Sequence, residues 1–202
     1  MPNIFVPQGQ HDRIAIMAPG PSLSREQVDK IMSAGMFTIA IGDAYLLNPF
    51  ADLLYHCDAR WWRHYKGVPD FYGCQRISME EVPDLPQVMQ IVKAPQRVGI
   101  ATEQSHIVAG SNSGYQAVNL AFHYRPKEII LVGYDMKKSA TGQYNVRGDH
   151  PPEIKGKGKF ETFIRKMALL VEPLATAGIS VYNCSLDSDL NCFPRRNLDS
   201  FV

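Results

Sequence analysis

The sequence predicts an α/β fold of the Rossmann-like, three-layer type, with helices on both faces of a mostly parallel sheet. Short apolar runs alternate with segments of helical periodicity, and this alternation is typical of parallel strands joined by crossover helices. Glycine, proline and serine gather where the apolar runs end, as turns between strands and helices require. The length of 202 residues predicts a single domain, residues 1–202.

The strands are predicted from short apolar runs that end in turn residues. These runs cover residues 13–18, 36–41, 53–57, 128–132 and 179–183, and a weaker one covers 87–92. The run at 128–132 is apolar along its length, which favours a central strand buried on both faces.

Helices are predicted between these strands from apolar residues at helical spacing. They cover residues 25–34, 44–47, 58–65, 114–124 and 160–174. In the first of them, Val28, Ile31 and Met32 share one face, and Gly35 follows the last turn. Prolines interrupt residues 68–104, which show no clear pattern.

Aromatic residues gather in the segment that follows Asp58. Trp61 and Tyr65 lie one helical turn apart and could form a surface on which a base stacks, whereas Trp62 faces inward. Packing in the core is the favoured interpretation of both tryptophans. The neighbouring His56 and His64 are interpreted as structural or rim residues.

Composition excludes several classes of protein. The 21 basic and 20 acidic residues leave a net charge of +1, too little to hold nucleic acid or an anionic membrane. No signal peptide and no membrane-spanning apolar run is evident, so a cytoplasmic protein is expected. The cysteines form no C-x-x-C pair, which argues for reduced, mostly buried thiols rather than a zinc or redox site. They are Cys57, Cys74, Cys184 and Cys192.

Two turns rich in small residues suggest a phosphate site. One has the sequence Ala-Pro-Gly-Pro-Ser-Leu-Ser at 18–24 and the other Gly-Ser-Asn-Ser-Gly at 110–114. Ser24 with Gln27, and Ser113 with Gln116, have the spacing of a capping box. Free N–H groups at a helix N-terminus favour an anion. Neither turn fits a P-loop or a dinucleotide fingerprint, so ordinary turns of an α/β sheet are the alternative.

Three carboxylates follow predicted strands. Asp43, Asp58 and Asp135 fall where strands 36–41, 53–57 and 128–132 end. Ligands of open parallel sheets bind at that edge. An aspartate there could hold Mg²⁺, bond a ribose hydroxyl or cap the next helix, and capping is favoured for Asp58.

Residues 136–159 are too irregular for a core element and long enough to form a lid. We call them the lid segment. They contain His150, a titratable ring in a constrained, irregular stretch near the proposed ligand edge, which makes it the best candidate for proton transfer. Lys155, Lys157 and Lys159 could close over a phosphate, although such a run is usually only solvated.

The order of these motifs resembles a known superfamily. Ala18-Pro19-Gly20-Pro21-Ser22-Leu23, then Asn112-Ser113-Gly114, then a strand ending in Gly133-Tyr134-Asp135, is similar to bacterial sialyltransferases of glycosyltransferase family 42. It is similar as well to the related archaeal 6-hydroxymethylpterin diphosphokinase-like proteins. The likeness runs from about residue 13 to 194. The segments 43–45 and 57–62 look most like uncharacterised phage-encoded members, which suggests a phage protein.

The resemblance implies roles for individual residues. Tyr144, His150 and Asp135 would be catalytic, with His150 as the base that takes a proton from the acceptor hydroxyl while CMP departs. No metal is obligatory in that reaction. The residues implied in nucleotide binding are Gly20, Pro21, Ser22, Asp43, Asp58, Ser113, Gly114 and Gly133.

The sequence departs from the sialyltransferase pattern at two places. Ala18-Pro19-Gly20 replaces Gly-Asn-Gly in the first turn, and Asp43 replaces an asparagine. A carboxylate repels a bare phosphate but accepts one bridged by Mg²⁺. Both changes weaken the case for sialyl transfer in particular.

Three functions are therefore considered. The first is a transferase that uses a CMP- or other nucleotide-activated sugar. The second is an ATP-dependent pyrophosphokinase, with Mg²⁺ held by Asp43, Asp58 or Asp135. The third is a non-catalytic phage protein that binds a nucleotide or another protein. A homo-oligomer is compatible with each of them.

Overall fold

The computed structural model describes residues 3–148, 150–154, 159–185 and 187–202. Its main sheet has seven strands in the order β5-β4-β3-β2-β1-β8-β9, and every neighbouring pair is parallel. The strands are β1 (Arg13–Met17), β2 (Phe37–Ile41), β3 (Leu53–His56), β4 (Gln75–Ser78), β5 (Val88–Gln90), β8 (Glu128–Val132) and β9 (Ser180–Asn183). A separate parallel pair joins β6 (Val92–Lys93) to β7 (His106–Ile107).

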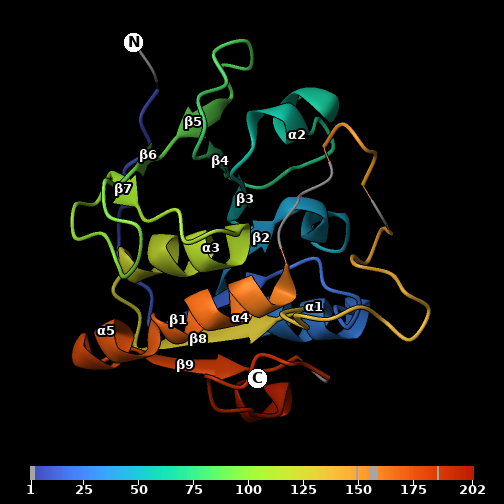
Figure 1. Ribbon diagram of the computed structural model, residues 1–202, viewed down its shortest axis with the longest axis vertical. Coiled ribbons are helices and arrows are strands. Elements are labelled where there is room, and N and C mark those ends of the chain that lie inside the picture. The colour runs from blue at the N-terminus through green and yellow to red at the C-terminus, as the bar shows by residue number, and fades with distance from the viewer. Residues whose placement is uncertain (1–2, 149, 155–158, 186) are drawn as a thin grey trace.

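Helices cover both faces of the sheet, which confirms the three-layer α/β fold. They are α1 (Arg25–Ser33), α2 (Ala59–His64), α3 (Ser113–Phe122), α4 (Phe160–Ala168) and α5 (Val171–Thr176), with short 3-10 turns η1 (Gly42–Leu46) and η2 (Leu198–Ser200). Figure 1 shows α3 and α4 lying across the near face of the sheet.

Strand alternation divides the interior into two cores. In β1, Ile14 and Ile16 pack with α3, α4 and α5, whereas Ala15 and Met17 pack with α1 and α2 on the other face. Successive side chains of a strand point to opposite faces, so each central strand contributes to both cores. Trp61 and Trp62 are 1% and 0% exposed within the second core, which confirms that they are core residues.

Successive strands are placed on one side of β1 and then on the other. From β1 it adds β2, β3, β4 and β5 on one side, and it then crosses to place β8 and β9 on the other. The order of strands therefore changes between β1 and β8, the position at which open α/β sheets form a ligand crevice beyond their carboxyl ends.

Helix caps decide how the predicted helices begin. Ser24 and Gln27 form the expected capping box, in which the Ser24 hydroxyl accepts from the Gln27 amide at 3.2 Å. Asp58 caps α2 by accepting from the Arg60 amide at 2.8 Å. The predicted cap at Ser113 is wrong: the cap of α3 is Asn112, whose side chain accepts from the Tyr115 amide at 2.9 Å.

Two predicted elements are divided in the structure. The apolar face predicted over 160–174 is present, but a turn at Leu169 and Leu170 separates α4 from α5. The weak strand at 87–92 is split between β5 and β6, which belong to different sheets.

The described part of the lid segment holds no helix or strand, as expected. In Figure 1 it leaves the end of β8, passes α2 and returns to α4. No described helix is long and apolar enough to cross a bilayer. The four cysteines are free; Cys184 is buried and Cys74 is exposed.

Candidate functional site

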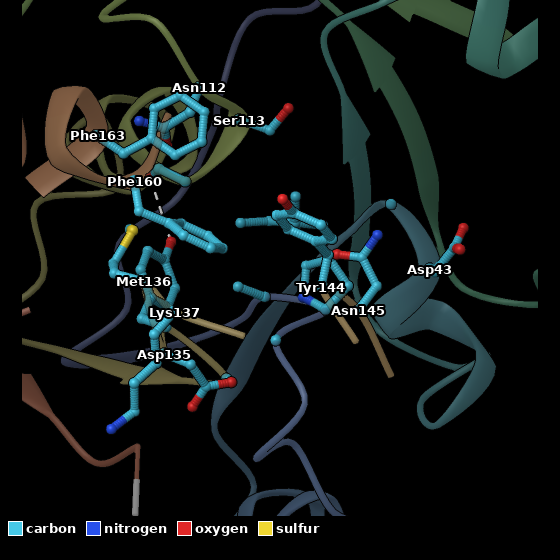
Figure 2. Close-up of a pocket in the computed structure, with 18 of the residues that line it drawn as sticks. Asp43, Asn112, Ser113, Asp135, Met136, Lys137, Tyr144, Asn145, Phe160 and Phe163 are labelled. Carbon is cyan, nitrogen blue, oxygen red and sulfur yellow. Dashed lines mark hydrogen bonds between the residues drawn. The ribbon is translucent and has the colours of Figure 1, made fainter. Parts of the chain in front are cut away.

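A cavity opens at the carboxyl edge of the sheet, where the strand order reverses. Its walls come from the ends of β1, β2, β3 and β8, the N-terminus of α3, the lid segment and the start of α4. Figure 2 shows these groups converging from sheet, helices and lid segment. The location is the one that the parallel topology predicts for a ligand.

Most of the predicted site residues lie together around this cavity. The lining includes Gly20, Asp43, Ser113, Gly114, Gly133, Asp135, Tyr144 and His150. Pro21 and Ser22 lie beside the cavity rather than in its lining, and the Ser22 amide donates to Asp135 Oδ2 at 2.9 Å. Asp58 lies outside the lining, where it caps α2 and forms an ion pair with Arg60. Lys155 and Lys157 lie outside the described residues.

The glycines of the first turn and of β8 pack directly on each other. The Gly20 amide donates to the Gly133 carbonyl at 3.1 Å. A Cβ atom on Gly20 would lie 2.1 Å from that same oxygen, and one on Gly133 would lie 2.1 Å from the Ala18 carbonyl oxygen. Their missing side chains therefore let two turns meet at the base of the cavity, a role independent of any phosphate.

The N-terminus of α3 lines the cavity with Asn112, Ser113 and Gly114. Amides in the first turn of a helix have no intrahelical acceptor, and the helix dipole adds partial positive charge there. Asn112 Nδ2 is buried and has no partner among the described residues. Gly114 lets the Tyr134 ring approach α3, because a Cβ there would lie 2.9 Å from Tyr134 Cε1. These groups suit an anion.

Asp43 and His150 face each other on another wall. Asp43 Oδ2 lies 3.7 Å from His150 Nδ1, and the two side chains are 0% and 17% exposed. Neither Asp43 oxygen has a hydrogen-bond partner in the described part of the chain, and neither does His150 Nδ1. Two segments distant in sequence thus bring a carboxylate to an imidazole.

Asp135 lies away from Asp43 on a different side of the cavity (Figure 2). Burial raises the pKa of its carboxyl group, and hydrogen bonds from Ser22 partly oppose that rise. Its Oδ1 has no partner within the described ranges. The carboxylate is therefore fixed by one oxygen and leaves the other for a ligand or a solvent molecule.

His56 is a cavity residue that sequence reasoning treated as structural or rim. It ends β3 and lines the cavity. Its Nδ1 accepts from the Asp58 amide at 3.1 Å, and its ring stacks on Trp61 with centroids 4.5 Å apart. Burial lowers the pKa of His56 to about 4. The ring is thus neutral at pH 7 and carries its proton on Nε2.

Two aromatic side chains of α4 add an apolar wall. Phe160 and Phe163 both line the cavity, and Phe160 packs against Tyr144 with ring centroids 5.6 Å apart. Both belong to the apolar face predicted over 160–174, and both are half-buried. The start of α4 therefore closes the cavity opposite the sheet.

Metal-ligand groups do not cluster in the described ranges. No group of three or more histidine, cysteine, aspartate or glutamate side chains there could hold a metal ion. A Mg²⁺ ion at Asp43 or Asp135 would therefore need ligand phosphates and water to complete its six oxygens.

Comparison with solved structures shows what the fold resembles. No family model matches the chain, and the search of curated proteins finds no match either. The structure of the MAf glycosyltransferase from Magnetospirillum magneticum AMB-1 superposes with a TM-score of 0.67 at 15% identity. The chain has a glycosyltransferase-like fold. The alignment covers 98% of this chain and 36% of that protein, so the likeness is to one part of a larger enzyme.

Proposed function

We propose that the protein is a nucleotide-dependent transferase that uses a nucleotide-activated sugar. The observation that carries the proposal is the meeting, in one cavity, of the α3 N-terminus and of His150 from the lid segment. At the α3 N-terminus, the side-chain amide of Asn112 has no partner among the described residues. The helix N-terminus supplies an anion site and His150 a proton acceptor. The fold shared with a glycosyltransferase supports this choice.

The phosphate of the donor would bind at α3. Asn112, Ser113 and Gly114 line the cavity, and Asn112 Nδ2 has no partner among the described residues. Phosphate oxygens accept from side-chain amides and from the free N–H groups of a helix N-terminus without a metal. Ser113 adds a hydroxyl to the same wall, and Tyr144 is the proposed second hydroxyl from the lid segment. Phe160 would exclude water from the reacting carbon.

His150 would act as the general base. The acceptor oxygen forms a bond to the anomeric carbon while the bond from that carbon to the phosphate oxygen breaks. The nucleotide leaves with the electron pair of that bond, and the hydroxyl proton moves to the His150 ring. Asp135 would orient the sugar or the acceptor through Oδ1, which has no partner within the described ranges.

A second candidate is the ATP- and Mg²⁺-dependent pyrophosphokinase. The observation that favours it is that both Asp43 oxygens and Asp135 Oδ1 lack a hydrogen-bond partner in the described part of the chain, since carboxylate oxygens are ligands that Mg²⁺ prefers. Their separation across the cavity in Figure 2 argues against one ion held by both. The non-catalytic phage protein is the third candidate, and it predicts no nucleotide binding at this cavity if its partner is another protein.

Thermal unfolding with CMP, CDP, UDP, GDP and ATP, each with and without Mg²⁺, tests these candidates. A nucleotide at 100 times its dissociation constant stabilises the folded state by about 2.7 kcal/mol. We expect CMP or another nucleotide to do so without metal. Stabilisation by ATP only with Mg²⁺ would select the pyrophosphokinase, and no stabilisation by any of them would refute nucleotide binding.

A matched pair of variants locates the binding. Asn112→Asp keeps an oxygen that accepts from the Tyr115 amide, so α3 stays capped, but it replaces the buried donor with a negative charge. We expect it to abolish the nucleotide-dependent stabilisation. Asn197→Asp makes the same change at the cap of η2 and should leave that stabilisation intact.

A further inference from the structure

We infer that Asp43 is a positioning residue, which holds the His150 imidazole with its proton on Nδ1 and leaves Nε2 as the proton acceptor. The inference rests on the proposed function, because it gives a chemical role to the base named there. It assigns Asp43 to the histidine rather than to the nucleotide or to a metal ion.

The first argument is the pairing of unsatisfied groups. Both Asp43 oxygens and His150 Nδ1 are buried and have no hydrogen-bond partner among the described residues. Buried polar atoms without partners are rare in native proteins. Here an acceptor, Oδ2, and the ring nitrogen lie 3.7 Å apart. A shift of less than 1 Å would join them, and catalytic hydrogen bonds are often long before substrate binds.

The second argument is the placement of charge around Asp43. Partial burial lowers the pKa of the Arg147 guanidinium. A hydrogen bond to Tyr65 and the charges of Asp43, Tyr45 and Tyr65 outweigh this effect, so the pKa of Arg147 is raised. The lid segment thus brings two groups that can carry positive charge, Arg147 and His150, toward Asp43.

The third argument is the chemistry of the two rings in the cavity. An ionised carboxylate only accepts hydrogen bonds, so beside it a neutral imidazole carries its proton on the facing nitrogen, Nδ1. His56 has the opposite arrangement, since its Nδ1 accepts from the Asp58 amide. The cavity therefore holds two histidines in different tautomers, and only the one beside Asp43 offers Nε2 as a base.

Asp43 would also act during the transfer. When the acceptor proton arrives at Nε2, the His150 ring becomes positively charged while Nδ1 keeps its own proton. A carboxylate beside Nδ1 stabilises that charge and is not itself protonated. This requirement gives a physical reason for an aspartate at a position where a direct contact to phosphate would be repulsive.

The test is ¹⁵N NMR of the imidazole groups in the full-length protein labelled with ¹⁵N-histidine, recorded at pH 8. His150→Gln identifies the His150 signals by their loss. We expect the wild-type protein to show His150 as the Nδ1–H tautomer and His56 as the Nε2–H tautomer. A wild-type His150 in the Nε2–H form would overturn the inference without any further variant.

Variants then identify Asp43 as the cause. Asp43→Asn lets an amide donate to Nδ1, so His150 should change to the Nε2–H tautomer. Asp43→Leu removes the acceptor altogether and should also lose the Nδ1–H form. Asp135→Asn changes the other buried carboxylate and should leave His150 as in the wild type. A His150 signal unchanged by both Asp43 variants would contradict the inference.

The outcome is separate from that of the nucleotide experiment. If His150 shows an Nδ1–H tautomer that depends on Asp43, but no nucleotide stabilises the protein, the inference about Asp43 is supported and the transferase proposal is refuted. Nucleotide stabilisation with an Nε2–H His150 would keep the transferase and refute the role of Asp43.

Discussion

At the scale of single residues, His56 makes the stability of the protein depend on pH. Its pKa is about 4 in the folded protein, because burial disfavours the charged ring, against about 6.5 in an unfolded chain. Between these values the unfolded state binds more protons than the folded state. The contribution of His56 to the free energy of unfolding is therefore fully present above pH 6.5 and is lost as the pH falls toward 4. The contribution amounts to about 3 kcal/mol.

Urea unfolding of the wild type and of His56→Asn at pH 7.5 and 4.5 measures this contribution. Asparagine keeps an oxygen near the position of Nδ1, where it can accept from the Asp58 amide, but it does not titrate. The variant should lose less stability on acidification than the wild type. His64→Asn, on the exposed surface of α2, should match the wild type. Equal pH dependence in His56→Asn and the wild type would show that His56 is not responsible.

Residue chemistry explains which site groups the sequence could predict. Gly20, Asp43, Ser113 and Asp135 were expected because they follow strands or begin a helix, and the cavity edge is fixed by strand direction. The Ser113 cap was wrong because the helix begins one residue earlier, where the Asn112 side chain accepts from the Tyr115 amide. No local signal distinguishes Asn112 from Ser113, since both residue types cap helices well.

At the scale of elements, several contacts hold the lid segment to the body of the protein, among them two hydrogen bonds and one buried side chain. The Val146 amide donates to the Pro19 carbonyl at 2.8 Å, Arg60 Nη1 donates to the Glu153 carbonyl at 3.3 Å, and Ile154 is buried in the core beneath α2. Ile154 contributes most of the apolar burial among these contacts. Local opening of the segment should therefore depend on that side chain.

Limited proteolysis of two neighbouring variants tests this dependence. Ile154→Ala should weaken the closed state by at least about 1.4 kcal/mol and speed tryptic cleavage after Arg147 about tenfold. Glu153→Ala changes an exposed side chain and leaves its backbone carbonyl in place, so it should be cleaved at the wild-type rate. Equal rates in the two variants would mean that Ile154 does not hold the segment closed.

Element prediction succeeded where apolar pattern decides the structure and failed where polar contacts do. The strand at 128–132 has the predicted bounds, because it is buried on both sides in the sheet. Strand β4 was missed because its sequence, Gln-Arg-Ile-Ser, is mostly polar. Arg76 donates to the carbonyls of Gly67, Val68 and Phe71, contacts formed only in the folded chain.

At the scale of the whole molecule, the order of strands could not be read from the sequence, although their direction could. Alternation of strands and helices predicts a parallel sheet, but nothing local tells whether β8 joins β5 or β1. The observed pairing of β8 with β1 at five positions, from Arg13 to Met17, creates the crevice. The site therefore depends on a long-range pairing that sequence pattern leaves open.

The same sheet predicts how the molecule unfolds. Both cores are built on β1, where Ile14 and Ile16 belong to one core and Ala15 and Met17 to the other. Because the two cores share the same strands, disruption of one core also destabilises the other. We expect one cooperative transition in calorimetry, with equal calorimetric and van't Hoff enthalpies. For 202 residues the enthalpy should be about 140 kcal/mol near 60 °C. Two resolved transitions, or a van't Hoff enthalpy well below the calorimetric one, would instead require a second folding unit, for which residues 68–104 and their separate β6–β7 pair are the candidate.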